Sequence, residues 1–170
     1  VPNYYKNTIV VYSFSKSLSL PGDRIGYFVL PSELDGYSEI FQASEVATRV
    51  LGFVNAPALQ QKVVAECCDE LTDVVFYDAN RELLYQSLTE YGYECIKPQG
   101  AFYLFVKALE QDDKAFCKKA KQYRLLLTPA TGFGCPGYVR IAYCVSRETI
   151  LNSLPSFQEL AKSYGITRSE

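Results

Sequence analysis

The sequence predicts an α/β fold, α+β in its second half, in which helices pack on a small mixed sheet. Three observations support this prediction. Short runs rich in β-branched and aromatic residues indicate buried strands. Longer stretches carry apolar residues three or four positions apart, as one buried helix face requires. The composition, 48% hydrophobic and 21% charged, is ordinary for a protein that buries a core.

The first predicted elements are two strands joined by a loop that contains a Pro-Gly turn. TIVVYSF at residues 8–14 and IGYFVL at residues 25–30 have the composition of buried strands. Because the later strands are far away along the chain, we expect these two to belong to a different sheet. A helix is predicted over residues 33–51, with Ser32 as its N-cap.

A long helix is predicted next, over residues 58–91. Asn55-Ala56-Pro57 is a typical helix start, a bend is expected near residues 78–80, and Gly92 ends the helix. The apolar residues that predict one buried stripe on its first half are Leu59, Val63, Cys67, Leu71 and Val74.

The second half of the chain alternates short strands and helices. Strands are predicted in YECI at residues 93–96, AFYLFV at 101–106, RLLLT at 124–128 and YVRIAYCV at 138–145. Helices are predicted over residues 112–123 and after the N-cap Ser146, where Pro155 is expected to kink or break the helix. Because a long helical run separates the first two strands from these later ones, we expect two domains, residues 1–54 and residues 55–170.

The composition argues against several classes of protein. A net charge of −2 and the lack of a basic run argue against nucleic-acid binding, and no apolar stretch is long enough to span a membrane. The chain has no histidine, which excludes Ser-His-Asp and Cys-His catalysis. Without histidine or a Cys-x-x-Cys motif, no zinc or other metal site is expected. Of its six cysteines, Cys67 and Cys68 are adjacent and the others are scattered, which predicts reduced, mostly buried thiols in a cytoplasmic protein.

The stretch SFSKSLSLPGDRIGY, residues 13–27, contains the candidate site. A lysine at the end of a buried strand is poorly hydrated, which disfavours its charged form and makes Lys16 a Schiff-base candidate. The hydroxyls of Ser13 and Ser15 can donate to phosphate oxygens, and Arg24 can bind the same phosphate with its forked donors. A solvated loop with incidental charges would carry the same residue types, and these alone do not decide between the two.

Two other motif matches fail on their context. Residues 13–16 fit Ser-x-x-Lys, the nucleophile motif of penicillin-recognising enzymes. The accompanying Ser-Asp-Asn and Lys-Thr-Gly motifs do not occur, and Ser13 is expected to follow a strand rather than open a helix. Residues 132–137 fit the dinucleotide motif Gly-x-Gly-x-x-Gly, but a strand rather than a helix is predicted after them.

Residues 13–27 resemble the active-site signature of class I/II aminotransferases, the aspartate aminotransferase-like enzymes of fold-type I that use pyridoxal 5′-phosphate (PLP). In that family the lysine forms a Schiff base with PLP, and Lys16 matches it. The serine three residues before the lysine and the arginine eight residues after it bind the cofactor phosphate, and Ser13 and Arg24 match them. Ser15 is a further candidate for the phosphate.

Two later segments extend the resemblance. PQGAFYLF at residues 98–105 resembles the Pro-x-Gly-Ala-Phe-Tyr segment of the family's small domain, and residues 126–144 resemble its C-terminal segment. The arginine of that segment binds the substrate α-carboxylate, and Arg140 matches it. The resemblance thus implies the C-terminal portion of the fold-type I PLP-dependent transferase fold. Residues 1–54 would be the last strands and helix of the PLP-binding large domain, and residues 55–170 the small domain.

The resemblance implies an enzyme that moves an amino group between an amino acid and a 2-oxo acid, homodimeric in its full-length form, with Lys16 as its catalytic residue. It also implies further cofactor contacts upstream of the lysine, among them an aspartate at the pyridine nitrogen. Since this chain begins only fifteen residues before Lys16, we expect it to be a C-terminal part that is inactive alone. A PLP-dependent C–S lyase that acts by β-elimination, and a non-catalytic fragment, stay open as alternatives.

Overall fold

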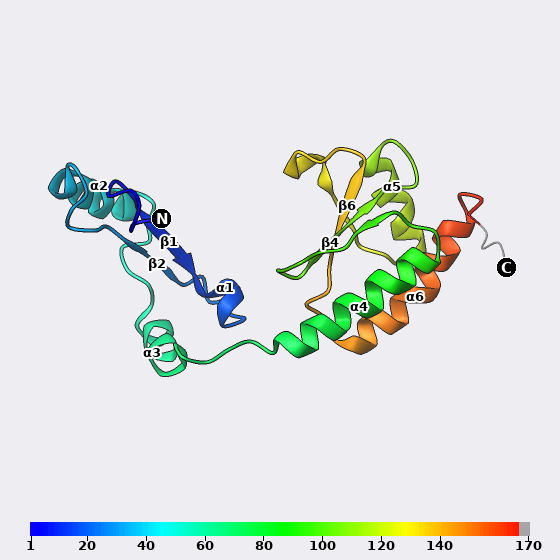
Figure 1. Ribbon diagram of the computed structural model, residues 1–170, viewed down its shortest axis with the longest axis horizontal. Helices are drawn as coiled ribbons and strands as arrows, with labels where there is room; N and C mark the ends of the chain where they lie inside the picture. Colours follow the sequence, from blue (N-terminus) through cyan, green and yellow to red (C-terminus); the bar gives the residue numbers. More distant parts are fainter. Residues whose placement is uncertain (167–170) are drawn as a thin grey trace. The chain divides into compact units, whose positions relative to one another are not determined.

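The computed structural model describes residues 1–166 (Figure 1). It divides the chain into two compact units, the first over Val1–Thr72 and the second over Asp73–Glu170. The predicted boundary between residues 54 and 55 concerns the domains of the resembled fold and stays a prediction. Within the described residues, no helix is both long enough and apolar enough to cross a membrane.

The first unit contains a two-stranded antiparallel sheet of β1 (Val10–Ser13) and β2 (Gly26–Val29), joined through the one-turn helix α1 (Phe14–Ser17) and a loop. The strands belong to a sheet of their own, as the sequence predicted. The prediction that they are buried is wrong for this chain, because nearly all their side chains are exposed within it. A Cβ on Gly26 would overlap the carbonyl oxygen of Tyr12, so glycine allows this close pairing.

The two helices of the first unit are α2 (Tyr37–Val50) and α3 (Ala58–Cys67). The predicted start of α3 after Pro57 is confirmed. The predicted cap of α2 is wrong, because turns fill the chain after Ser32 and the N-cap is Gly36.

The predicted long helix over residues 58–91 is also wrong. The chain leaves the helical conformation after α3 and re-enters it at α4 (Val74–Glu90), whose N-cap Asp73 accepts a hydrogen bond from the amide of Phe76. No bend interrupts α4 at residues 78–80. The apolar spacing that continues across the gap is therefore coincidental.

The second unit is built on one four-stranded sheet in the order β3-β4-β6-β5, and every neighbouring pair is antiparallel rather than mixed. The four predicted strands all exist but are shorter than predicted, and residues 124–127 lie outside the sheet. The strands predicted over 101–106 and 124–128 end one residue later than predicted, at residues 107 and 129. Its edge strands β3 and β5 have two residues each. The strands are β3 (Cys95–Ile96), β4 (Tyr103–Lys107), β5 (Thr128–Pro129) and β6 (Tyr138–Ala142).

Helices complete the second unit. Besides α4, they are α5 (Asp113–Ala120), α6 (Arg147–Lys162) and the short 3₁₀ helices η1 (Lys121–Tyr123) and η2 (Ala130–Phe133). Figure 1 shows α4 and α6 side by side, and the two helices are in contact. The predicted cap of α6 is confirmed, since the Ser146 hydroxyl accepts a hydrogen bond from the Thr149 amide at 3.1 Å. α6 runs through Pro155 without the predicted break, and the kink that was the alternative stays a prediction. Proline has no amide hydrogen, so the carbonyl of Leu151 loses its helical partner.

The hydrophobic core of the second unit lies between the sheet and its helices. Its most buried members come from every layer: Leu84 and Leu88 of α4, Leu104 and Val106 of β4, Phe116 of α5, Val139 of β6 and Leu160 of α6. Asn80 is fully buried among them and donates to the carbonyls of Tyr143 and Val145, at 3.2 and 2.9 Å. These hydrogen bonds connect α4 to the segment that follows β6.

Candidate active site

The first group of candidate residues stands where β1 passes into α1. Ser13 ends β1 and caps α1: its Oγ accepts from the Ser15 amide at 3.3 Å and donates to the Ser15 Oγ at 2.9 Å. The two hydroxyls therefore lie together in the same helical turn as Lys16. Ser13 does open a helix, so that part of the case against Ser-x-x-Lys is wrong, although its companion motifs are still missing. Lys16 is exposed, so the expected poor hydration is not found in this chain.

Arg24 belongs to the same end of the hairpin. Ser13 pairs with Gly26, and Arg24 is two residues before Gly26, so the strand register brings it to the end that carries α1. The Phe14 amide donates to the Ile25 carbonyl at 3.2 Å and closes this end. The backbone of Arg24 is in the left-handed region, with φ 50°, which costs on the order of 1 kcal/mol. Its Nη1 donates to the Pro21 carbonyl at 2.8 Å.

This cluster combines hydrogen-bond donors with an amine. Two neighbouring hydroxyls and a guanidinium suit the oxygens of a phosphate, and a primary amine can condense with an aldehyde. The set of donors on these four residues therefore fits a phosphorylated aldehyde such as PLP. The individual roles of Ser13, Ser15, Lys16 and Arg24 stay predictions.

Arg140 lies in the second unit, in the middle of the sheet. It pairs with Phe105 of β4, and Tyr103 is two residues further along on the same face. Its Cζ lies 4.3 Å from the centre of the Tyr103 ring and 4.2 Å from that of Phe133. Within residues 1–166, no carboxylate forms an ion pair with Arg140. The guanidinium is thus stacked by two rings, while its edge donors can bind an external carboxylate.

The sequence did not identify the residues that surround Arg140. Phe133 stands in a Gly-Phe-Gly stretch, which marks a loop but does not reveal what the ring covers. Asp113 begins α5, is only 2% exposed, and accepts hydrogen bonds from the amide and hydroxyl of Thr131. Burial raises the pKa of the Asp113 carboxyl, but the Thr131 donors and nearby Lys114 outweigh it and hold this pKa below its usual value.

The segment that resembles Pro-x-Gly-Ala-Phe-Tyr is held by side chains from two elements. Arg81 of α4 donates to the Pro98 carbonyl at 3.2 Å, and the Tyr143 hydroxyl donates to the Ala101 carbonyl at 2.9 Å. Ala101 is left-handed, with φ 59°, which is unfavourable for a residue with a Cβ. Hydrogen bonds from α4 and from Tyr143 therefore hold the loop over residues 98–101 in this strained conformation.

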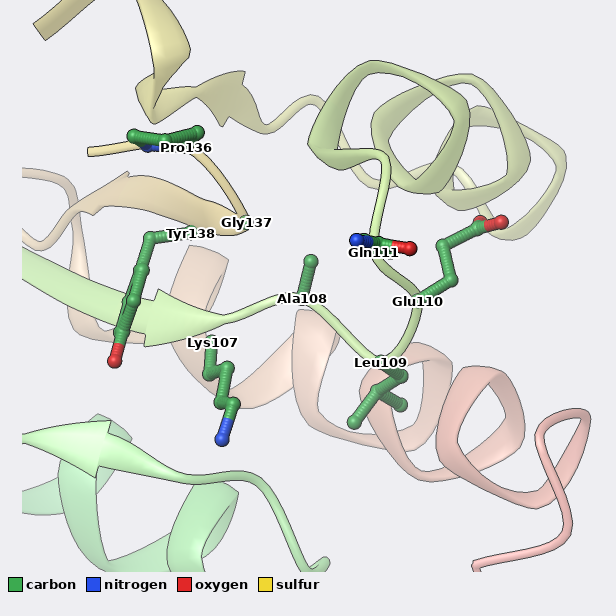
Figure 2. Close-up of a pocket in the computed structure, with 8 residues that line it drawn as sticks. All are labelled: Lys107, Ala108, Leu109, Glu110, Gln111, Pro136, Gly137 and Tyr138. Carbon is green, nitrogen blue, oxygen red and sulfur yellow. The ribbon is translucent and has the colours of Figure 1, made fainter. Parts of the chain in front are cut away.

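A pocket of about 580 Å³ opens at the end of the β4–β6 pair. Figure 2 shows Lys107 and Tyr138 on the strand side, and Glu110 and Gln111 on the loop that leads to α5. Lys107 is paired with Glu94 at 2.7 Å. None of the predicted site residues lines this pocket.

The six cysteines are free thiols. The prediction that they are mostly buried is wrong, because Cys68, Cys135 and Cys144 are exposed and only Cys117 is fully buried. The three exposed residues follow the ends of regular elements, where the chain turns toward solvent.

Comparison with known proteins gives consistent matches. A family model described as aminotransferase class I and II matches residues 3–156. A (5-formylfuran-3-yl)methyl phosphate transaminase of Methanocaldococcus jannaschii is 30% identical over 162 residues, which cover 91% of this chain and 42% of that protein. An aspartate aminotransferase of Thermotoga maritima is 25% identical over 160 residues, which cover 94% of this chain and 41% of that protein.

Solved structures agree with these matches. The crystal structure of an aminotransferase from Eubacterium rectale is 54% identical with a TM-score of 0.85, and the match covers 96% of this chain and 41% of that one. The aspartate aminotransferase structure from Thermotoga maritima, 24% identical with a TM-score of 0.76 and covering 91% and 40%, agrees in fold. The chain thus spans about two fifths of the length of the relatives that it matches.

Proposed function

The chain belongs to the class I and II aminotransferase family, and from this premise we propose that it is the C-terminal part of an enzyme that moves an amino group between an amino acid and a 2-oxo acid. Aminotransferases of this class are PLP-dependent. The observation that carries the proposal is the cluster of two hydroxyls, an amine and a guanidinium at the α1 end of the first hairpin. These are the donors that a phosphorylated aldehyde requires.

The candidate residues would then perform three tasks. The Lys16 amine would form the Schiff base that attaches PLP and, once displaced by the substrate, would carry the proton at the substrate Cα. Ser13, Ser15 and Arg24 would bind the phosphate, and Arg140 would bind the substrate α-carboxylate through its paired edge donors. When bound, PLP supplies the electron sink that weakens a bond at the substrate Cα.

We further propose that the full-length enzyme is a cytoplasmic homodimer that binds neither nucleic acid nor membranes. The net charge of −2 and the lack of a basic run support the part on nucleic acid. The free, partly exposed thiols fit a reducing compartment. We also propose that the 170-residue chain is inactive by itself, since it spans about two fifths of the length of its relatives.

The first test is an absorbance spectrum of the 170-residue chain with added PLP. A visible band that disappears in Lys16→Ala and persists in Lys62→Ala, an exposed lysine of α3, would support the assignment of the amine. A band that survives Lys16→Ala would contradict it. No band in any variant would mean that binding requires residues outside this chain.

The reaction itself needs a second assay, with full-length protein. Transfer that depends on an added 2-oxo acid would support the proposed reaction. Release of pyruvate without a 2-oxo acid would instead indicate β-elimination by a C–S lyase of the same fold.

A further inference from the structure

The surroundings of Arg140 suggest how its orientation is fixed. The Cζ of its guanidinium lies over two rings, 4.3 Å from the centre of the Tyr103 ring and 4.2 Å from that of the Phe133 ring. An arginine side chain has many rotamers, and stacking on aromatic faces restricts the plane of its fork. Tyr103 is fixed by the sheet, since it pairs with Ala142 of β6. The position of Phe133 needs a different explanation.

Phe133 is not held by the core, because its side chain is 49% exposed. It is the last residue of η2, so the backbone of η2 determines where the ring lies. Fully buried Ala130 anchors the beginning of η2, and its carbonyl accepts from the Cys135 amide at 3.0 Å. Gly134, left-handed with φ 75°, ends the turn directly after Phe133.

Asp113, in α5, forms hydrogen bonds to Thr131 in the middle of η2. Its Oδ2 accepts from the Thr131 amide at 2.7 Å, and its carboxylate also accepts from the Thr131 hydroxyl at 2.7–2.8 Å. Hydrogen bonds to a charged acceptor are about twice as strong as neutral ones. Asp113 also occupies the first turn of α5, where the helix dipole favours a negative charge. The buried carboxylate thus links α5 to the turn that carries Phe133.

We propose that Asp113 and Phe133 are positioning residues for Arg140. The Asp113–Thr131 hydrogen bonds hold η2, η2 holds the Phe133 ring, and this ring together with Tyr103 holds the guanidinium in one plane. Its edge is then ready for a carboxylate without a further loss of side-chain entropy. The choice of an α-carboxylate as the ligand rests on the proposed function, whereas the stacking does not.

The stacking can be tested in the 170-residue chain, which has no tryptophan. Phe133→Trp places the only tryptophan of the chain beside Arg140, and excitation at wavelengths that tyrosine does not absorb reads it apart from the 14 tyrosines. We expect acrylamide to quench it about twofold more strongly when Arg140→Ala is added, because the guanidinium no longer covers the indole. Arg147→Ala, which removes an exposed arginine of α6, is the matched control and should leave quenching unchanged.

The role of Asp113 is tested in the same background. Asp113→Asn and the milder Thr131→Val should each raise the quenching toward the value of the Arg140→Ala variant, while circular dichroism shows a folded chain. Because Thr131→Val keeps the amide bond to Asp113, unchanged quenching in both folded Asp113→Asn and folded Thr131→Val would overturn the role of the Asp113–Thr131 link. Equal quenching with and without Arg140 would overturn the stacking itself.

The link to carboxylate binding is tested in the full-length protein, with a panel of L-amino acids as donors and 2-oxoglutarate as acceptor. Phe133→Leu should raise KM for the amino acid about fivefold with little change in kcat. Phe133→Tyr, which keeps a ring, should have the KM of the unaltered protein. A fall in kcat with unchanged KM would overturn the positioning role. If the unaltered protein transfers no amino group, the proposed function fails, and the quenching still decides the stacking.

Discussion

Residues 1–72 and residues 73–166 both contain many apolar side chains, but the two units bury them to very different extents. In the second unit, Leu88 and Leu160 are completely buried. In the first, all of which is described, only Ile25 and Leu34 are buried apolar residues. Large side chains of that unit stay exposed, among them Val11, Val50, Phe53 and Leu71.

The difference shows that a site and a core need not coincide. The second unit has a core that crosses all its layers, and this core fixes β6 and hence Arg140. The first unit holds Ser13, Lys16 and Arg24 near one another through a hairpin register and a few local hydrogen bonds. The arrangement of these three residues is therefore formed in the first unit without the burial of apolar surface that would stabilise it.

The largest difference between the two units is expected when each is studied alone. We expect residues 73–170 alone to unfold cooperatively in urea, because their core is complete, and residues 1–72 alone to show no cooperative transition. Circular dichroism at increasing urea concentrations measures both. A sharp transition in residues 1–72 would show that the first unit has more stabilising contacts than its burial indicates.

Paired leucine substitutions give the next largest effect. Leu88→Ala in α4 removes a fully buried side chain and should lower the free energy of unfolding by about 2–5 kcal/mol. Leu59→Ala in α3, where the leucine is 68% exposed, should change it by less than about 0.5 kcal/mol. Urea midpoints of the two variants test this. Equal losses would mean that α3 is packed in solution.

Asp113 makes the stability of the second unit depend on pH. Its folded pKa lies below its usual value, so the folded chain binds this proton more weakly than the unfolded chain does. Its contribution is complete above the unfolded pKa, near 3.8, and is lost as the pH falls through the lower folded pKa.

Asp113→Asn should therefore destabilise the chain by about 1–2 kcal/mol at neutral pH and flatten the loss of stability in acid. Urea midpoints between pH 6 and pH 3 measure both effects. Asp69→Asn, an exposed change in the first unit, is the control. If both variants keep the same acid dependence as the unaltered chain, Asp113 does not contribute in this way.

The cysteines give the smallest effect, which concerns reactivity rather than stability. Burial raises the pKa of Cys117 and of Cys95 to about 11, so little thiolate forms at pH 8. Iodoacetamide should modify Cys68, Cys135 and Cys144 first, as mass spectrometry of timed samples would show. Early modification of Cys117 would indicate that α5 opens readily.

Local signals in the sequence predicted local features well. Pro57 and Ser146 mark helix starts because the backbone preferences of a terminus depend on a few neighbouring residues. The two strands on either side of the Pro-Gly turn were likewise predicted from their β-branched and aromatic runs. The one-turn helix α1 that carries Lys16 was missed, because a loop was predicted there. The gap between α3 and α4 was missed because the apolar spacing continues through Leu71.

Features that depend on distant partners could not be read in this way. The exposure of β1 and β2 depends on what covers them, and a strand's composition does not record this. The rings beside Arg140 come from β4 and η2, two elements that are distant along the chain from one another, so the composition of neither segment indicates this contact. The wholly antiparallel pairing also follows from the connections rather than from any one strand.

The two sheets also differ at their edges. In the second unit both edge strands are very short, and β5 includes Pro129, which has no amide hydrogen to offer a further strand. In the first unit β1 and β2 are longer, flanked by exposed apolar side chains, and free of proline. Self-association of this chain would therefore begin by strand addition at residues 10–13 or 26–29, and a proline or lysine placed there would suppress aggregation without touching the sheet that holds Arg140.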